Sequence, residues 1–133
     1  MLFCVGALGD EIRSEDGHDL MELILGWGYP VERHYIRTED GLDLMTLRIP
    51  HGREEVEWSP RQAVICQHGL LDSSEAWISN LPNESLAYIL ADRGMDIWMP
   101  NNRGNKYSQP EEDTAASWRF TFDESRCTCV PRC

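Results

Sequence analysis

The spacing of apolar residues predicts a helix close to the start of the chain. Four apolar side chains recur at positions i, i+3, i+4 and i+7, which places them on one face of an α-helix. They are Leu20, Leu23, Ile24 and Trp27. Ser14 or Asp16 can cap the first turn, and Gly26 and Gly28 followed by Pro30 end the helix.

Two extended stretches follow this helix and predict a β-hairpin. Residues 31–38 and 42–49 are joined by residues 39–41, whose Asp-Gly pair supplies the positive φ angle of a tight turn. The second stretch carries apolar residues on both faces, so we expect partial burial on both. The polar segment 51–61 then predicts an exposed loop without chemistry.

A strand, a loop, a helix and a second strand come next, in the order of a βαβ unit. The short apolar runs 62–67 and 95–99 predict buried parallel strands. A helix over 84–93 lies between them and ends at Gly94. Its predicted inward side chains are Leu86, Ala87, Ile89 and Leu90. The fold class is therefore α/β, and a last short helix is predicted over 114–123.

Composition and charge exclude several classes of protein. A length of 133 residues allows one domain at most. Twelve Lys and Arg against 23 Asp and Glu give a charge of −11, so we expect no nucleic-acid partner. No apolar run reaches the roughly 18 residues of a transmembrane segment. The five cysteines, three of them in the last seven residues, lack zinc-site spacing, so we expect no metal.

The catalytic triad of a serine hydrolase is missing from the sequence pattern. None of the nine serines lies in the G-x-S-x-G turn that exposes the nucleophile of α/β-hydrolases. The catalytic histidine comes last in that fold, whereas all four histidines here precede the second βα unit. They are His18, His34, His51 and His68. The chain also has no H-E-x-x-H, P-loop or G-x-G-x-x-G pattern.

Segment 67–74, which follows the first predicted buried strand, has the pattern of a ligand-binding loop. Backbone N–H groups at the carboxyl end of such a strand can point into the crevice where ligands bind. Gly69 allows a sharp turn, and the N–H of Leu70 is the candidate donor. The residues alone leave open the alternative of an ordinary turn beside a hydrogen-bonded His68.

Three co-linear stretches resemble the acid lipase family of α/β-hydrolases, the lysosomal and gastric lipases with their lipase-associated N-terminal region. They read LILGWGYPVERHYIRTEDG, QHGLLDSSEAWISNLPNESLAYILADRGMDIWMPNNRGNKYS and WRFTFDE. The resemblance implies hydrolysis of triacylglycerols and cholesteryl or related esters through an acyl-serine, without a metal or another cofactor. It also implies a secreted or lysosomal location, although residues 1–9 lack the basic region of a signal peptide.

The same resemblance assigns roles to individual residues. Leu70 supplies one N–H of the oxyanion hole, and His68 and Gly69 shape its loop. The neighbouring loop, which we expect to be structural, contains Asn102, Arg103 and Gly104. Asn83 begins an N-x-S sequon and is a glycosylation candidate, or alternatively caps the following helix.

The sequence departs from the family after Glu124. There the family continues towards the strand that bears the nucleophile, whereas residues 125–133 form a Cys-rich tail. This tail resembles an out-of-frame or intron-derived ending, and a genuine alternative C-terminus is the other explanation. We expect four segments: an N-terminal stump or signal remnant (1–13), the lipase-associated helix and hairpin (14–61), the first βα units of an incomplete hydrolase sheet (62–124) and the aberrant tail.

Two functions follow from these expectations. The first is a partial acid-lipase-like protein that is inactive by itself, because the nucleophile, the acid and the catalytic histidine are absent. The second is a non-enzymatic product that binds lipid or protein, including a second copy, through exposed sheet edges.

Overall fold

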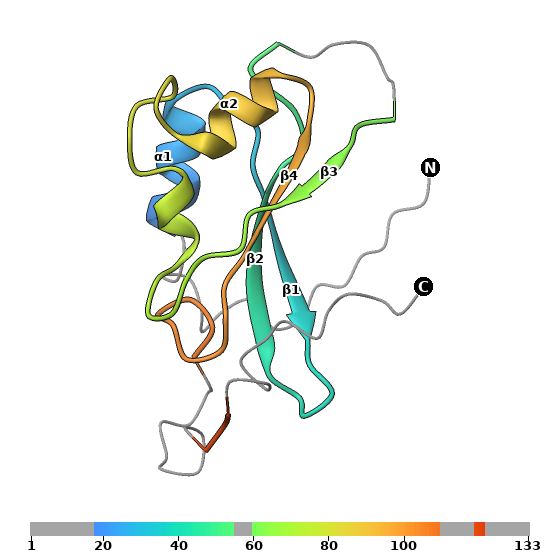
Figure 1. Cartoon of the computed structure of the whole chain (residues 1–133), viewed down its shortest axis with the longest axis vertical. Coiled ribbons are helices and arrows are strands. Elements are labelled where there is room, and N and C mark those ends of the chain that lie inside the picture. Colours follow the sequence, from blue (N-terminus) through green and yellow to red (C-terminus); the bar gives the residue numbers. More distant parts are fainter. Residues whose placement is uncertain (1–17, 55–59, 110–118, 122–133) are drawn as a thin grey trace.

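The structure, a computed structural model, describes residues 18–54, 60–109 and 119–121 (Figure 1). Its elements in chain order are α1 (His18–Gly26), β1 (Glu32–Arg37), β2 (Asp43–Ile49), β3 (Ala63–Ile65), the 3₁₀ helix η1 (Ser74–Trp77), α2 (Leu86–Asp92) and β4 (Asp96–Pro100). This order of elements confirms the predicted α/β class. None of the described helices combines the length and the apolar character that a membrane crossing requires.

The strands form one sheet in the order β1-β2-β4-β3. β1 and β2 are antiparallel, as the predicted hairpin requires, and Gly41 adopts a φ of 89° in the turn between them. β3 and β4 are parallel neighbours on either side of α2 in the chain, which confirms the βαβ unit. β2 is also antiparallel to β4, so the hairpin and the βαβ unit share a single sheet.

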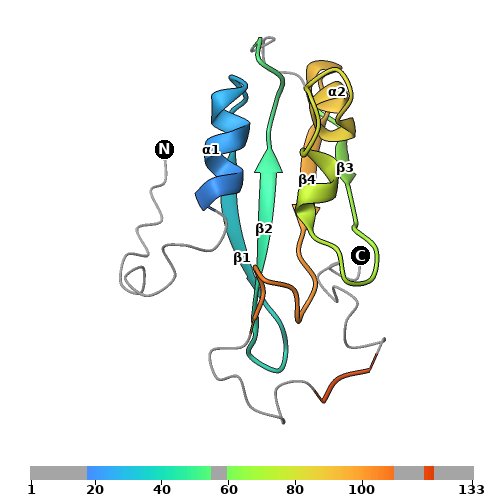
Figure 2. The same cartoon turned by 90° about the vertical axis from the view of Figure 1, so that its left-hand side faces the viewer.

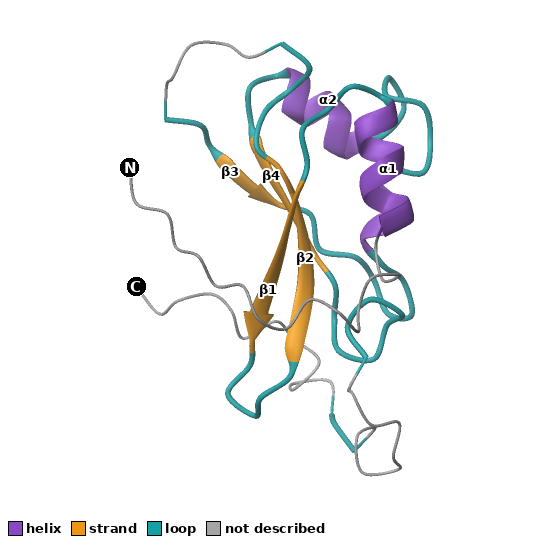
Figure 3. Cartoon of the chain, turned by 180° about the vertical axis from the view of Figure 1, so that it is seen from behind, coloured by secondary structure: helices purple, strands orange, loops and turns teal. Residues whose placement is uncertain are grey.

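Both helices lie on the same face of the sheet. In Figure 2, α1 lies over β1 and α2 lies over β4 and β3, with β2 between the two helices. The view from behind again shows both α-helices on one side of the sheet (Figure 3). Alternate residues of the two central strands are fully buried between the sheet and the helices. They are Met45, Leu47, Ile49, Ile97 and Met99. β2 is also buried on its other face at Leu44 and Thr46, as expected.

The buried stripe of α1 is narrower than the sequence predicts. Leu20 and Ile24 are buried as expected, but Leu23 and Trp27 are 38% and 39% exposed, so their predicted burial is wrong. Leu20 and Ile24 are one turn apart, and the partly buried Met21 completes the stripe. A nine-residue helix lying on a sheet buries only the side chains that point directly at it, which is why the flanking positions remain outside.

The start and the buried face of α2 also differ from the prediction. Ser85 is the N-cap residue, so the alternative that Asn83 caps this helix is wrong. The Ser85 hydroxyl bonds the backbone N–H and C=O of Asn80 at 3.1 and 2.9 Å, which fixes the chain entering the helix. The buried side chains are Ala87, Tyr88 and Ala91. Leu86, the first residue of α2, is 44% exposed because it does not lie on the helix face formed by the three buried residues, so its predicted inward position is wrong.

β3 is parallel to β4 as predicted, but it is not buried. Ala63 and Ile65 are exposed, Ile65 by 63%, and Val64 between them packs against the core. β4 is the only described strand that pairs with β3. The α-helices α1 and α2 cover the face of the sheet opposite to Ala63 and Ile65 (Figure 2). The apolar composition of a short segment does not indicate which face of the resulting strand other elements will cover.

Several predicted features lie outside the described residues. These are the caps at Ser14 and Asp16, the N-terminal residues 1–13, the tail 125–133 and most of the predicted helix 114–123. Residues 119–121 of that helix are described and are not helical.

A polar cluster ties the loop after β2 to the last turn of α2. The Tyr29 hydroxyl donates to Asp92 Oδ2 at 2.7 Å, and Arg53 Nη2 donates to the same oxygen at 3.0 Å. The ring of Tyr29 stacks on that of Tyr88, with centroids 4.5 Å apart. Gly52 passes so close to α2 that a Cβ would lie 2.8 Å from Asp92 Cα. A side chain at this position would therefore push the loop away from α2.

The two stacked tyrosines predict a loss of stability at alkaline pH. Burial and then the hydrogen bond to Asp92 raise the pKa of Tyr29 to about 12, and burial raises the pKa of Tyr88 to about 12. Between pH 10 and 12 the unfolded chain ionises at these residues while the folded chain does not. The stabilisation that comes from these two un-ionised tyrosines is therefore fully present below pH 10. The free energy of unfolding should fall as the pH rises from 10 towards 12.

Two hydroxyl deletions separate burial from hydrogen bonding in this pair. Tyr29→Phe should cost about 1 kcal/mol at pH 7, because it removes the bond to Asp92. Tyr88→Phe should cost little, because its hydroxyl has no partner among the described residues. Each variant should flatten the alkaline decline, measured by urea unfolding. If the two variants lost the same free energy of unfolding at pH 7, the Tyr29 hydroxyl would not be the one that forms a stabilising hydrogen bond.

Candidate functional site

Two loops meet where the parallel strands β3 and β4 end. We call residues 67–74 the strand-exit loop and residues 101–108 the asparagine loop. They lie side by side at the same end of the sheet (Figure 1). The carboxyl ends of neighbouring parallel strands are where α/β proteins place their ligand sites, so the topology brings the predicted loop to a suitable edge.

A tight turn presents Leu70 and Leu71 at the tip of the strand-exit loop. The Asp72 N–H donates to the Gly69 carbonyl at 3.3 Å, and Leu71 has a φ of 61°. A positive φ at the third residue is that of a type II turn, where glycine is preferred, and it costs a leucine on the order of 1 kcal/mol or more. The two leucine side chains are 80% and 97% exposed. The turn therefore stores backbone strain and exposes apolar surface together.

His68 is buried and hydrogen-bonded through both ring nitrogens. The Asn102 backbone N–H points at His68 Nε2, with 3.0 Å between the two nitrogens. His68 Nδ1 lies 2.7 Å from the Gly69 carbonyl oxygen. A backbone N–H can only donate, so Nε2 is the acceptor and the proton is on Nδ1. The neutral imidazole thus donates to Gly69. Both nitrogens are used in holding the loop, which leaves neither free to act as a base.

The hydrogen bonds to Gly69 set the direction of the Leu70 N–H. The Gly69 carbonyl and the Leu70 N–H belong to one peptide group, and they point in opposite directions because the peptide is trans. The carbonyl accepts from both His68 and Asp72. The Leu70 N–H therefore points away from these donors, and it donates to no atom of the described residues.

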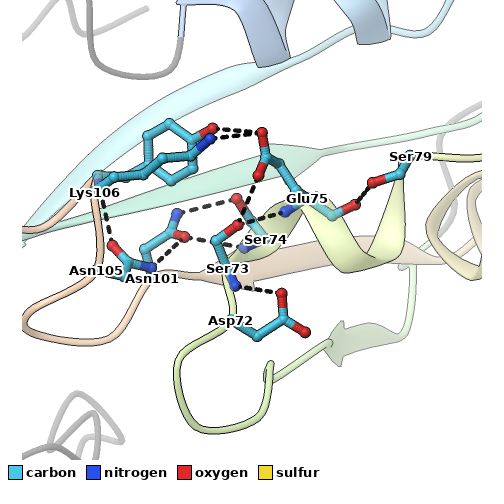
Figure 4. Close-up of polar contacts among 9 residues, drawn as sticks. Asp72, Ser73, Ser74, Glu75, Ser79, Asn101, Asn105 and Lys106 are labelled. Atoms are coloured by element: carbon cyan, nitrogen blue, oxygen red, sulfur yellow. Dashed lines mark hydrogen bonds and ion pairs between the residues drawn. The ribbon is translucent and has the colours of Figure 1, made fainter.

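Asn101 is a buried polar residue that the sequence analysis did not single out. Its side chain is fully buried and uses all four amide hydrogen-bonding positions, and Figure 4 shows the bonds to Ser74 and Asn105. Oδ1 accepts from the Ser74 N–H at 3.0 Å and from Asn105 Nδ2 at 2.8 Å. Nδ2 donates to Ser74 Oγ at 3.1 Å and to the Met45 carbonyl at 3.2 Å. Its position directly after a buried strand was the only available signal.

Glu75 fastens the start of η1 to the asparagine loop. Its Oε1 accepts from Lys106 Nζ and from the Tyr107 hydroxyl, both at 2.9 Å (Figure 4). The hydrogen bond from Lys106 is the main reason why the pKa of Glu75 lies below its usual value. Ser73 donates to Oε2 at 3.3 Å and caps η1 by accepting from the Glu75 N–H. These contacts hold Glu75 as a structural anion, so it is not poised as a general base.

The predicted structural loop divides its contacts between two partners. Asn102 faces the strand-exit loop, where its Oδ1 accepts from Gln67 Nε2 at 3.1 Å. Arg103 turns to the hairpin and makes a bidentate pair with Asp40 at 2.5 and 2.7 Å. This pair holds the pKa of the Asp40 carboxyl far below its usual range. Gly104 has a φ of 83° and allows the loop to reverse.

The described residues at this edge of the sheet present a backbone hydrogen-bond donor. No hydrogen bond between a serine hydroxyl and a histidine ring occurs in residues 18–54, 60–109 and 119–121. The same residues contain no cluster of three His, Cys, Asp or Glu side chains suited to a metal ion. Cys66 is buried, and burial raises the pKa of its thiol. The arrangement can thus present a backbone N–H to an oxygen atom of a ligand.

Two family models match the chain and overlap at the strand-exit loop. The model described as a partial alpha/beta-hydrolase lipase region matches residues 20–81, and the alpha/beta hydrolase fold model matches residues 62–126.

Curated relatives cover most of this chain. Lipase member K of Mus musculus is 45% identical over 115 residues, which are 83% of this chain and 29% of the relative. Lysosomal acid lipase/cholesteryl ester hydrolase of Homo sapiens is 44% identical over 118 residues, 85% of this chain and 30% of the relative. Gastric triacylglycerol lipase of Bos taurus is 44% identical over 115 residues, 83% and 29% of the two chains. The chain spans less than a third of the length of these relatives.

Proposed function

Because the chain belongs to the acid lipase family of α/β-hydrolases, we propose that its strand-exit loop supplies one backbone donor to the oxyanion hole of an ester hydrolase. The peptide group between Gly69 and Leu70 is the observation that supports this proposal. Its carbonyl is bound by His68 and Asp72, and its N–H has no acceptor among the described residues. An oxyanion would accept from that N–H at about 2.7–3.1 Å.

In the proposed reaction the N–H acts on charge that develops during the attack. A serine Oγ loses its proton to a general base as it adds to the ester carbonyl carbon, and the C=O electron pair moves onto oxygen. Leu70 N–H donates to this oxyanion. The pair then returns to re-form C=O, and the alkoxide leaves with a proton from the general base, which gives an acyl-serine. His68 fixes the N–H direction beforehand, so the donor need not reorganise when the charge appears.

We propose neutral lipid esters as the substrates of the site. Two of the relatives are named for triacylglycerol and for cholesteryl ester, and Leu70 and Leu71 add exposed apolar surface beside the donor. Family membership also suggests a secreted or lysosomal location. Asn83 is exposed and does not cap α2, so its amide is available for the proposed glycan.

The 133 residues are proposed to be inactive by themselves, since none of the nine serines lies in a G-x-S-x-G turn. A fluorogenic long-chain ester assay at pH of about 5 and 8 tests this. The control is Leu70→Pro, which removes the donor N–H. We expect the chain and this variant to give the same background rate, and turnover by the chain above the variant would contradict the proposal.

A non-enzymatic binding function is the second candidate. β3 is an edge strand of the described sheet, and an edge strand can pair with another chain through its backbone. Ile65 of this strand is 63% exposed and adds apolar surface there. If the chain has this function, it should show no ester turnover and should associate as its concentration rises, which sedimentation measures.

A further inference from the structure

We propose that Asn101 and Asn102 are positioning residues that staple both ends of the strand-exit loop and so fix the Leu70 N–H. This inference rests on the proposed function, because it concerns the placement of the same donor. Both residues belong to the asparagine loop, and Asn101 is not among the site residues predicted from the sequence.

The entrance of the loop is held by Asn102. Its Oδ1 accepts from Gln67 Nε2 at 3.1 Å, and its backbone N–H donates to His68 Nε2 at 3.0 Å. His68 in turn donates through Nδ1 to the Gly69 carbonyl. Two bonds thus connect Asn102 to the peptide group that bears the Leu70 N–H.

The exit of the loop is held by Asn101. Its side-chain amide makes two hydrogen bonds to Ser74, one to the backbone N–H and one to the hydroxyl (Figure 4). The same amide is anchored to β2 through the Met45 carbonyl and to the asparagine loop through Asn105. The exit is therefore tied to the central sheet and cannot shift without breaking a buried network.

The two ties close the loop into a ring. Asn101 and Asn102 are consecutive, so their Cα atoms are about 3.8 Å apart, and the segment from Gln67 to Ser74 begins and ends on this one dipeptide. Closing a flexible segment in this way removes many of its conformations. Inside the ring, the turn at Gly69–Asp72 keeps a strained leucine at φ 61°. A backbone strained in this way persists only when its surroundings fix it.

Hydrogen exchange of the ¹⁵N-labelled 133-residue chain tests the staple. The Asp72 amide reports the turn because it donates to Gly69, and the Cys66 amide reports the sheet because it donates to Trp98 at 2.8 Å. We expect Asn101→Ala to speed exchange at Asp72 by roughly tenfold or more, the loss expected for a buried hydrogen-bond network. Cys66 exchange should stay unchanged, and the Leu70 amide resonance should shift.

Two further variants keep the test decisive. Asn102→Ala, at a partly exposed position, removes only the hydrogen bond to Gln67 and should speed Asp72 exchange by a smaller factor. If Asn101→Ala does not fold, this second variant tests whether the asparagines fix the strand-exit loop. Asn83→Ala, at an exposed asparagine outside the network, should change neither amide. Equal acceleration at Asp72 and Cys66, or no acceleration at Asp72, would overturn the staple. The result does not depend on ester hydrolysis, so a failure of the proposed function would be seen separately.

Discussion

Leu70→Pro should lower ester turnover by roughly 10² to 10³-fold in an enzyme whose oxyanion hole includes this loop. The host is human lysosomal acid lipase in which the 118 aligned residues are replaced by those of this chain, at 44% identity. Proline has no N–H, so the variant removes the proposed donor and leaves the rest of the exchanged enzyme intact. The loss should appear in kcat, because the donor acts on the oxyanion and not on the bound ester.

The geometry of the turn makes proline a clean probe at this position. Leu70 is the second residue of a type II turn, where proline is favoured, and the Gly69 carbonyl keeps both of its donors. Leu70→Ala is the matched control, because it removes the exposed side chain and retains the N–H. It should keep kcat within a few-fold of the exchanged enzyme. Equal losses in the two variants, at unchanged circular dichroism, would show that the N–H is not the donor.

Ile97→Ala should destabilise the chain by about 2–5 kcal/mol, the range for truncating a fully buried isoleucine. Ile97 lies in β4 and pairs with Ile49 of β2 and Val64 of β3, so its side chain fills the centre of the sheet's covered face. The cavity left by alanine would lie under the helices, where neighbouring side chains have little freedom to close it.

Ile65→Ala is the matched control for this core position. Ile65 lies in β3 beside Trp98 of β4 and is 63% exposed, so the same truncation should cost about 0.5 kcal/mol or less. Urea unfolding of both variants measures the difference. Similar losses would mean that β3 is buried as its sequence suggests, and that the assignment of covered and uncovered faces is wrong.

Local signals were sufficient to predict the order and the pairing of the elements. The Asp-Gly pair at Gly41 and the glycine after α2, Gly94, adopt φ angles of 89° and 85° as a tight turn and a helix end require. Such positions depend on a few neighbouring residues, and the sequence contains those residues in full. Hairpin, helix and βαβ unit were therefore predictable within a few residues.

Burial was less predictable, because it depends on where other elements lie. The run 62–67 has the composition of a buried strand, yet Ile65 is exposed since both described helices cover the other face. Leu23 and Trp27 have the spacing of a buried helix face, yet the sheet contacts only the stripe of Leu20 and Ile24. Neither outcome can be read from the periodicity of one element alone.

The candidate site shows the same division. Leu70 and His68 stood out because a histidine and a glycine directly follow the predicted strand 62–67, which is a local pattern. Asn101 did not, because the partners of its amide come from β2, η1 and its own loop, as far as 56 residues away along the chain. A polar dipeptide after a strand is typical of any surface loop, and only the fold shows that the first asparagine is fully buried.

Turnover by the exchanged enzyme without further substitution tests most directly whether this loop is an oxyanion loop of the acid lipase kind. Hydrolysis of a triacylglycerol emulsion is measured for the parent and for the protein with the 118 exchanged residues. Since the donor, its histidine and the asparagine staple all come from this chain, we expect kcat within about tenfold of the parent, or about 1.4 kcal/mol. A folded exchanged protein that hydrolyses no ester would contradict the proposal.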